Sequence, residues 1–322
     1  MATQDTIVYR PLRRSDYASY HEVVGLAVGK FERATGLDLS SEATIAQLSR
    51  RWIWFVLRLA GLFGRPIVDT MVACQARQVV GTATVLWLPS TAYVAGVATR
   101  PEFRGRGVAT HLLGLLAERA RGHHRRWMAL DVESENLGAI QVYRKAAYRD
   151  AEAYAWLTRT DVPRPESPAS ASVASVGSSD WESIIARLEA GRPADYRDAF
   201  PATGSVLSHN EILVRGGRVG YETWKRELPG GGVAVMRAYF VPGVGIAAYF
   251  PMSTTPEASP DEFVDLIDAA TDWLTPQRPN HILAVAPEPR SNSTIALERR
   301  GFTVAASTTA MLARVGDGRS RT

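Results

Sequence analysis

The chain has 322 residues, of which 46% are hydrophobic, 22% charged and 9% aromatic. A chain of this length and composition can bury two hydrophobic cores, which excludes global disorder and a disulfide-stapled miniprotein. Cys74 is the single cysteine, so an internal disulfide and a metal site of several cysteines are excluded and a cytoplasmic location is favoured. The formal net charge of +4 favours anionic ligands without identifying one.

Two further features of composition bear on origin and targeting. The 37 basic residues comprise 34 Arg and 3 Lys, which together with the many alanines is typical of a GC-rich bacterial genome. Residues 1–10 lack a basic segment followed by an apolar one, so we expect no signal peptide.

The hydrophobic periodicity of the first half predicts short strands alternating with longer helices. In chain order we expect a strand over 7–10, helices over 16–31 and 41–62, strands over 71–75, 79–88 and 93–99, a helix over 108–121, a strand over 128–133, a helix over 137–146 and a strand over 151–157. Hairpins followed by strand–helix crossovers indicate the α/β (α+β) class, with a mixed, mostly antiparallel sheet flanked by helices.

The second half repeats the plan of the first. Residues 161–179 are rich in Pro, Ser and Ala, as expected of a linker, and similar segments occur in the same order on either side of it. The matching features are a helix start (Ser15 and Ser179), a hairpin glycine (Gly81 and Gly220) and a helical stretch (135–148 and 290–302). We therefore expect an N-terminal domain over 1–162, a linker over 163–178 and a degenerate C-terminal copy over 179–322.

A glycine-rich turn between a strand and a helix, residues 104–110, is the segment most indicative of chemistry. Gly105 and Gly107 permit backbone conformations closed to other residues and let a ligand approach closely. Amides at the start of the following helix form an anion site suited to a pyrophosphate. No Lys follows the turn, as an NTPase P-loop requires, and Thr110 stands where a dinucleotide-binding fingerprint has its third glycine.

The pattern Arg104-x-x-Gly107-x-Ala109 at the end of a strand resembles the acyl-CoA loop of the GCN5-related N-acetyltransferase (GNAT) family. Downstream, Asn136 and Tyr143 show the seven-residue step of that family's next helix. The two motifs occur in the family's order and spacing, and the resemblance extends over about residues 5–160 and faintly into the second half. The chain is thus identified as a tandem-domain member of this superfamily.

The resemblance implies a role for each matching residue. Backbone groups of one strand end would pair with the pantetheine arm of the donor, namely those of Val97, Ala98 and Thr99. Amides of the turn and helix start would hold the pyrophosphate, with added charge from Arg104 and Arg106; they belong to Gly105, Arg106, Gly107, Val108, Ala109 and Thr110. Asn136 would hydrogen-bond the arm, and Tyr143 would protonate the departing thiolate unless it serves only to pack on the sheet.

Two carboxylates are candidates for the general base. Asp131 and Glu133 lie two residues apart on one predicted strand and so face the same side. Asp131 occupies the place where related protein acetyltransferases carry a catalytic Glu, and its shorter side chain favours a relaying water. Either carboxylate could instead be an exposed strand residue or an anchor for the acceptor, and Glu102 beside the turn is expected to be solvated.

Three features depart from the family pattern. Ala147 and Tyr148 replace the usual Gly-Phe pair, which changes a turn and a core aromatic. The second half has prolines and carboxylates over 251–262 where the first has its glycines and arginines, and these would repel a phosphate. Leu297 replaces the tyrosine of the first half, so we expect the second copy to shape the acceptor site or brace the first rather than bind acyl-CoA.

Residues 41–67 form the most apolar stretch of the chain and have three readings. They predict a helix covering the sheet, a lid for a long acyl chain or apolar acceptor, or a surface helix that docks on a membrane or protein. About 13 consecutive apolar residues are too few for a transmembrane helix. The histidine spacing gives no metal site, and the arginines of 100–126 lack the interleaved aromatics of a nucleic-acid surface.

The sequence therefore predicts an enzyme, an N-acyltransferase that moves an acetyl or longer acyl group from acyl-CoA to a primary amine of a small molecule. It uses acetyl-CoA or another acyl-CoA and no metal. Alternatives are a long-chain transferase fed by an acyl-carrier protein, a protein N-acetyltransferase, and a non-catalytic CoA-binding module.

Overall fold

The computed structural model describes the chain in seven stretches: residues 6–35, 68–161, 172–200, 220–241, 245–255, 258–288 and 290–316. The chain folds into two compact units. Unit 1 comprises residues 1–151 with 310–322, and unit 2 comprises residues 152–309. The predicted helix over 41–62 and the first part of the predicted linker lie outside the described residues.

Unit 1 is built on a mixed sheet with the strand order β1-β2-β3-β4-β5-β12. The pairs β1–β2, β2–β3 and β3–β4 are antiparallel, whereas β4 and β5 run parallel. The strands are β1 (Val8–Pro11), β2 (Val68–Gln75), β3 (Gln78–Trp87), β4 (Thr91–Thr99), β5 (Trp127–Glu133) and the end of β12 (Thr303–Arg314). This mixed, mostly antiparallel sheet with flanking helices confirms the predicted fold class.

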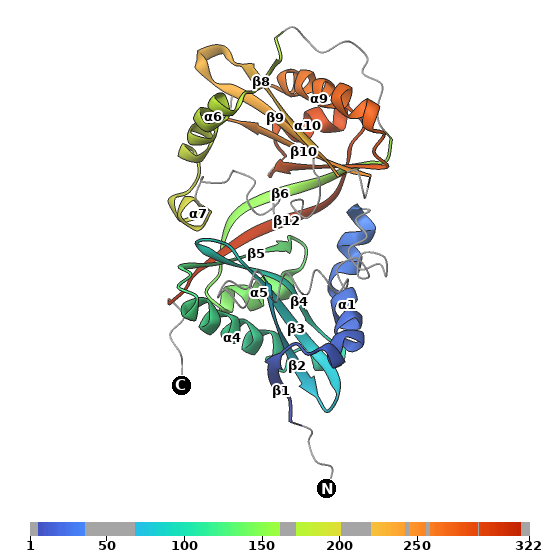
Figure 1. Cartoon of the computed structure of the whole chain (residues 1–322), viewed down its shortest axis with the longest axis vertical. Helices are drawn as coiled ribbons and strands as arrows, with labels where there is room; N and C mark the ends of the chain where they lie inside the picture. Colours follow the sequence, from blue (N-terminus) through green and yellow to red (C-terminus); the bar gives the residue numbers. More distant parts are fainter. Residues whose placement is uncertain are drawn as a thin grey trace. The chain divides into compact units, whose positions relative to one another are not determined.

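Helices cover both faces of the unit 1 sheet (Figure 1). On one face lies α1 (Tyr17–Thr35), whose Val23 is fully buried in a small apolar cluster. On the other face lie α4 (Val108–Gly122) and α5 (Leu137–Lys145), which share the main core of the unit. The helix α4 presents five buried apolar residues at helical spacing: Val108, Leu112, Leu113, Leu116 and Ala120.

A buried ion pair fixes the point at which α1 begins. Asp16 is 4% exposed and accepts two hydrogen bonds from the Arg10 guanidinium, at 2.6 and 2.9 Å, and one from the Arg13 amide at 2.8 Å. The hydrogen bond from Arg10 lowers the pKa of Asp16, so its carboxylate stays charged. The pair ties β1 to the short 3-10 turn that leads into α1.

Unit 2 has the same kinds of element. Its sheet has the strand order β12-β6-β11-β10-β9-β8-β7. The strands are β6 (Arg149–Arg159), β7 (Ala174–Ser175), β8 (Gly220–Glu227), β9 (Val233–Val241), β10 (Ile246–Ser253), β11 (His281–Pro287) and the start of β12. Its helices are α6 (Ser178–Ala190), α7 (Ala194–Ala199), α9 (Pro260–Leu274) and α10 (Asn292–Arg299). Helices α9 and α10 pack on the larger apolar cluster and α6 on a smaller one.

The strand that ends each half of the sequence contributes to the compact unit formed by the other half. β6 comes after α5, yet from Glu152 onwards it belongs to unit 2, where it pairs antiparallel with β11. β12 comes after α10 and ends in unit 1, where the Val315 amide donates to the Arg126 carbonyl at 2.8 Å. The compact units therefore differ from the expected domains at 1–162 and 179–322, because strand pairing rather than chain order decides which core a strand completes.

The ends of α5 and α10 have the same backbone geometry. The Tyr148 amide donates to the Tyr143 carbonyl at 3.0 Å, and the Phe302 amide donates to the Leu297 carbonyl at 3.1 Å. The residue before each aromatic is left-handed, with φ of +67° at Ala147 and +79° at its counterpart glycine. This shared pattern supports the pairing of Leu297 with Tyr143 across the two units.

Ala147 is strained by this left-handed conformation, which costs a residue with a Cβ about 1 kcal/mol relative to glycine. We expect Ala147→Gly to raise the free energy of unfolding by about 1 kcal/mol, measured by urea denaturation. The matched control is Ala146→Gly, because Ala146 has a φ of −86° and gains nothing from glycine. Equal effects of the two substitutions would contradict the expected strain.

Candidate functional site

The strands β4 and β5 separate along their length. In the described part of unit 1 their parallel ladder consists of three pairs: Thr91↔Trp127, Ala92↔Met128 and Tyr93↔Ala129. Beyond these pairs β4 continues to Thr99 and β5 to Glu133. The edge of β4 that faces β5 is therefore open to another hydrogen-bonding chain over residues 94–99, which include the predicted Val97, Ala98 and Thr99.

A β-bulge lies in the part of β4 beyond its ladder with β5. Thr82 pairs with Ala98 and Thr84 pairs with Ala95, so β4 has two residues, Gly96 and Val97, opposite one residue of β3. Gly96 has a φ of +62°, a conformation that glycine adopts without strain. The bulge turns Val97 towards the α4 side and Ala98 towards the α1 side of the sheet.

The glycine-rich turn leads directly into α4. Gly105 and Gly107 have φ of +73° and +79°, and a Cβ placed on either would meet no atom within 4 Å. Both glycines are thus required by the backbone conformation and not by crowding, and the space beside the turn is open. Gly107 is the N-cap of α4, and among the described residues no side chain caps that helix start. The first amides of α4 are consequently available to an anion.

Three arginines surround this turn and differ in their partners. Arg100 is tied to the fold, since it donates to the Val79 carbonyl at 2.8 Å and to Glu22 at 2.5 Å. Arg104 and Arg106 are exposed, and within the described stretches neither pairs with a carboxylate. The Arg104 Nε atom donates to the Thr99 carbonyl at 3.3 Å, so that carbonyl already has a partner. These two guanidinium groups leave positive charge beside the α4 start.

Gly81 on β3 sets the position of the start of α4. A Cβ at this residue would lie 2.6 Å from Val108 Cγ1, 3.2 Å from the Ala98 carbonyl oxygen and 3.5 Å from Leu112 Cδ1. Val108 is 1% exposed, so the first turn of α4 rests directly on the backbone of β3. Gly81 is also the predicted hairpin glycine that matches Gly220 of the second half, and its lack of a side chain allows this close approach.

We expect Gly81→Ala to lower the free energy of unfolding by about 1–3 kcal/mol, because the added methyl overpacks the contact with Val108. Gly114→Ala is the control, since Gly114 lies within α4, is exposed and has no atom within 4 Å of an added Cβ. That change should be neutral or stabilise the helix by up to about 1 kcal/mol. Chemical denaturation of both variants tests the contact, and a Gly81→Ala protein as stable as the wild type would refute it.

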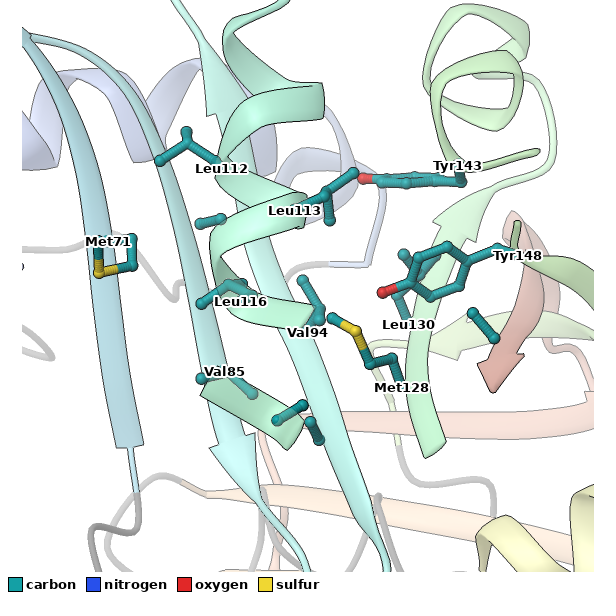
Figure 2. Packing of buried hydrophobic residues seen from close by; sticks show 14 of the residues in the cluster. Met71, Val85, Val94, Leu112, Leu113, Leu116, Met128, Leu130, Tyr143 and Tyr148 are labelled. Carbon is teal, nitrogen blue, oxygen red and sulfur yellow. The ribbon is translucent and has the colours of Figure 1, made fainter. Parts of the chain in front are cut away.

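Tyr143 is held inside unit 1 by the end of α5. It is 7% exposed, and burial raises its pKa to about 12, so it keeps its proton at neutral pH. Its ring lies 5.9 Å from that of Tyr148, centroid to centroid, at an angle of 59°. Figure 2 shows the Tyr143 hydroxyl directed towards Leu113 of α4. The side chain is thus packed and yet retains a hydroxyl that can donate a proton.

Asp131 and Glu133 lie on the opposite face of β5 from Tyr143. Leu130 and Val132 belong to the same buried cluster as Tyr143, so the two carboxylates between and after them point to the other side. Both carboxylates are half-buried. The structure therefore brings the two predicted bases to one face and the predicted acid to the other face of the same strand, beside the opening between β4 and β5.

Tyr93 is a contact of Asp131 that the sequence did not reveal. Its hydroxyl donates to Asp131 Oδ2 at 2.6 Å across the β4–β5 pair. The tyrosine opens a predicted strand, but the register between two parallel strands joined by a long crossover cannot be read from sequence. Tyr93 thus orients the carboxylate of Asp131.

Asn136 has a structural role at the start of α5. Its Oδ1 atom accepts a hydrogen bond from the Ala139 amide at 3.2 Å and so caps the helix. The side chain is exposed, and its amide nitrogen can still donate hydrogen bonds. Capping and ligand binding are compatible for this residue because they use different atoms.

The corresponding helix start in unit 2 is closed by its own side chains. The Ser259 Oγ atom accepts from the Glu262 amide at 3.4 Å, and Glu262 Oε2 accepts from the Ser259 amide at 2.7 Å. This reciprocal capping box satisfies the amides of Ser259 and Glu262 and places a carboxylate at the positive end of α9. The start of α9 therefore disfavours a phosphate, in contrast to the start of α4.

Two searches over the described residues give negative results. No group of three or more His, Cys, Asp or Glu side chains there is arranged to hold a metal ion. No helix in those stretches is long and apolar enough to cross a membrane.

Comparison with known proteins relates this site to one family. A family model described as the acetyltransferase (GNAT) family matches residues 38–148, which contain the turn, α4, β5 and α5. A search of curated proteins finds no match to the chain. Among solved structures, a GCN5-related N-acetyltransferase from Sphaerobacter thermophilus is 15% identical, with a TM-score of 0.59 and coverage of 97% of this chain and 96% of that chain.

A second solved structure shares the two-unit plan. It is a tandem GNAT protein from the clavulanic acid biosynthesis pathway, 15% identical, with a TM-score of 0.53 and coverage of 97% of this chain and 100% of that chain. At such identities the similarity shows the fold alone. It extends over both units of the chain.

Proposed function

Because this chain is a tandem-domain member of the GNAT superfamily of acyltransferases, we propose that unit 1 transfers an acyl group from acyl-CoA to a primary amine of a small molecule. The observation that carries the proposal is the start of α4. Two left-handed glycines, open space beside them and an uncapped helix N-terminus form an anion site next to two diverging strands. A pyrophosphate joined to an extended arm fits that combination.

The donor fits the residues around the turn. Amides of residues 105–110 would hold the pyrophosphate, and the Arg104 and Arg106 guanidinium groups would add charge. The open edge of β4 at Val97 and Ala98 would pair with the amide groups of the arm as an added strand. The Asn136 amide nitrogen would donate to the same arm from the opposite strand end.

The reaction needs one proton removed and one delivered. The donor supplies a thioester carbonyl, which the amine nitrogen attacks; a C–N bond forms, and the C–S bond breaks with its electron pair passing to sulfur. Tyr143 would donate its proton to that sulfur and recover one from solvent. Asp131, oriented by Tyr93, or Glu133 would take the proton that the amine loses, directly or through a water.

The face of the sheet on which these carboxylates lie is proposed to receive the acceptor. Two carboxylates there, Asp131 and Glu133, attract a protonated amine as well as deprotonate it. Unit 2, whose α9 start is closed by Ser259 and Glu262, is proposed to bind no acyl-CoA. A cytoplasmic enzyme is proposed from the single cysteine, and an acyl-carrier protein remains an alternative source of the acyl group.

Release of free thiol, followed over a panel of amines with acetyl-, octanoyl- and palmitoyl-CoA, tests the proposed function. Turnover with at least one pair is expected. Measurable CoA binding without turnover of any pair would favour the non-catalytic binding module instead.

We expect Tyr143→Phe to lower kcat about 100-fold while the donor Kd changes less than threefold, because the ring remains and only the proton donor is lost. Burial raises the pKa of Tyr143 to about 12, so Tyr143 should stay protonated between pH 7 and about pH 10. Its ionisation should therefore not lower the wild-type kcat over that range. Tyr249→Phe in unit 2, which removes a buried hydroxyl bonded to Thr271 at 3.1 Å, is the control. Equal kcat in Tyr143→Phe and wild type across the pH series would exclude the general acid.

We expect Gly107→Glu to abolish CoA binding in calorimetry, since it combines strain at a φ of +79° with negative charge at the α4 start. Gly107→Ala separates the two causes: it introduces the strain alone and should weaken binding about tenfold. Undiminished affinity of Gly107→Glu would remove the turn from the donor site.

A further inference from the structure

Tyr148 carries a buried hydroxyl that is unsatisfied. The residue is 3% exposed, and its Oη atom has no hydrogen-bond partner in the part of the chain that the structure describes. A buried hydroxyl left unpaired destabilises a folded protein, so such groups usually have a partner. Burial also raises the pKa of Tyr148 strongly, which keeps the hydroxyl neutral and able to donate.

The corresponding position of unit 2 shows that the fold needs only an aromatic ring there. Phe302 has the same backbone hydrogen bond as Tyr148, is also 3% exposed, and packs 5.8 Å from the ring of Tyr249. A phenylalanine therefore satisfies the packing demands of this position. The hydroxyl of Tyr148 is an addition that packing does not explain.

The hydroxyl lies deeper in unit 1 than Tyr143. Figure 2 shows it directed into the core between α4 and the sheet, on the side of Val94 and Met128, whereas the Tyr143 hydroxyl lies nearer the start of α4. Val94 is the first residue of β4 beyond its ladder with β5. An acyl chain that entered at the turn and ran along β4 would therefore meet Tyr143 first and Tyr148 next.

We propose that Tyr148 is a specificity-determining residue that selects a short acyl group carrying a neutral oxygen beyond the thioester carbonyl, such as a hydroxyl or a ketone. The proposal rests on the proposed function, since it assigns the far end of the same donor site. The oxygen would accept the hydrogen bond that the Tyr148 hydroxyl lacks. Apart from Tyr143, the cluster that contains Tyr148 consists of side chains such as Val94, Met128 and Leu130, so a charged carboxylate would be disfavoured.

The test compares 3-hydroxybutyryl-CoA with butyryl-CoA, which differ by one hydroxyl, in wild type and in Tyr148→Phe. For the wild type we expect about tenfold higher kcat/KM and about tenfold tighter calorimetric binding with the 3-hydroxy donor. Tyr148→Phe should abolish both preferences, and Tyr143→Phe should lower turnover of both donors while it keeps their binding ratio. Succinyl-CoA should be a poorer donor than either for the wild type.

An unchanged donor ratio in Tyr148→Phe would overturn the proposal, even if both donors are turned over. If neither donor binds, the proposed function itself fails, which is a different result. Stability gives an independent readout: Tyr148→Phe should raise the unfolding temperature of the ligand-free protein, because an unpaired hydroxyl is removed. A lower unfolding temperature would show that the hydroxyl is already satisfied without a ligand and would also overturn the inference.

Discussion

The organisation of unit 1 depends on helix α4, whose start has no side-chain cap among the described residues. The start of α4 rests on Gly81, where a side chain would collide with Val108, and it is preceded by Gly107 in a left-handed conformation. The first amides of α4 have no side-chain acceptor among the described residues, so they favour an anion at this point. The divergence of β4 from β5 begins beyond Tyr93 and extends along β4 towards the same turn, which provides room for the group that carries the anion. An acyl-CoA satisfies both features with one molecule.

Unit 2 has the same kinds of element, but its corresponding helix start is capped. Ser259 and Glu262 cap α9 from within, Leu297 stands where Tyr143 would be, and Gly301 relieves the strain that Ala147 bears. Among the described residues, the uncapped start of α4, the left-handed Ala147 and the partnerless Tyr148 hydroxyl belong to unit 1. Unit 2 has buried side-chain atoms of its own without a partner in the described stretches, at Glu189, Thr255 and His281.

The turn and the helices could be predicted from sequence because their signals are local. Gly105, Gly107 and the step from Asn136 to Tyr143 act through neighbouring residues of one segment. The exchange of β6 and β12 could not be predicted, because two similar halves offer each last strand equivalent partners and pairing is decided by long-range contacts. The Tyr93–Asp131 hydrogen bond depends on the register of two strands separated by a helix, which no local pattern encodes.

The stoichiometry of CoA binding tests most directly the claim that the donor site exists once, at the start of α4. Isothermal titration of the full chain with CoA should give one site per chain. Two sites of similar affinity would contradict the claim, because the second would have to lie at a helix start that Ser259 and Glu262 already close. Absence of any binding would contradict it equally.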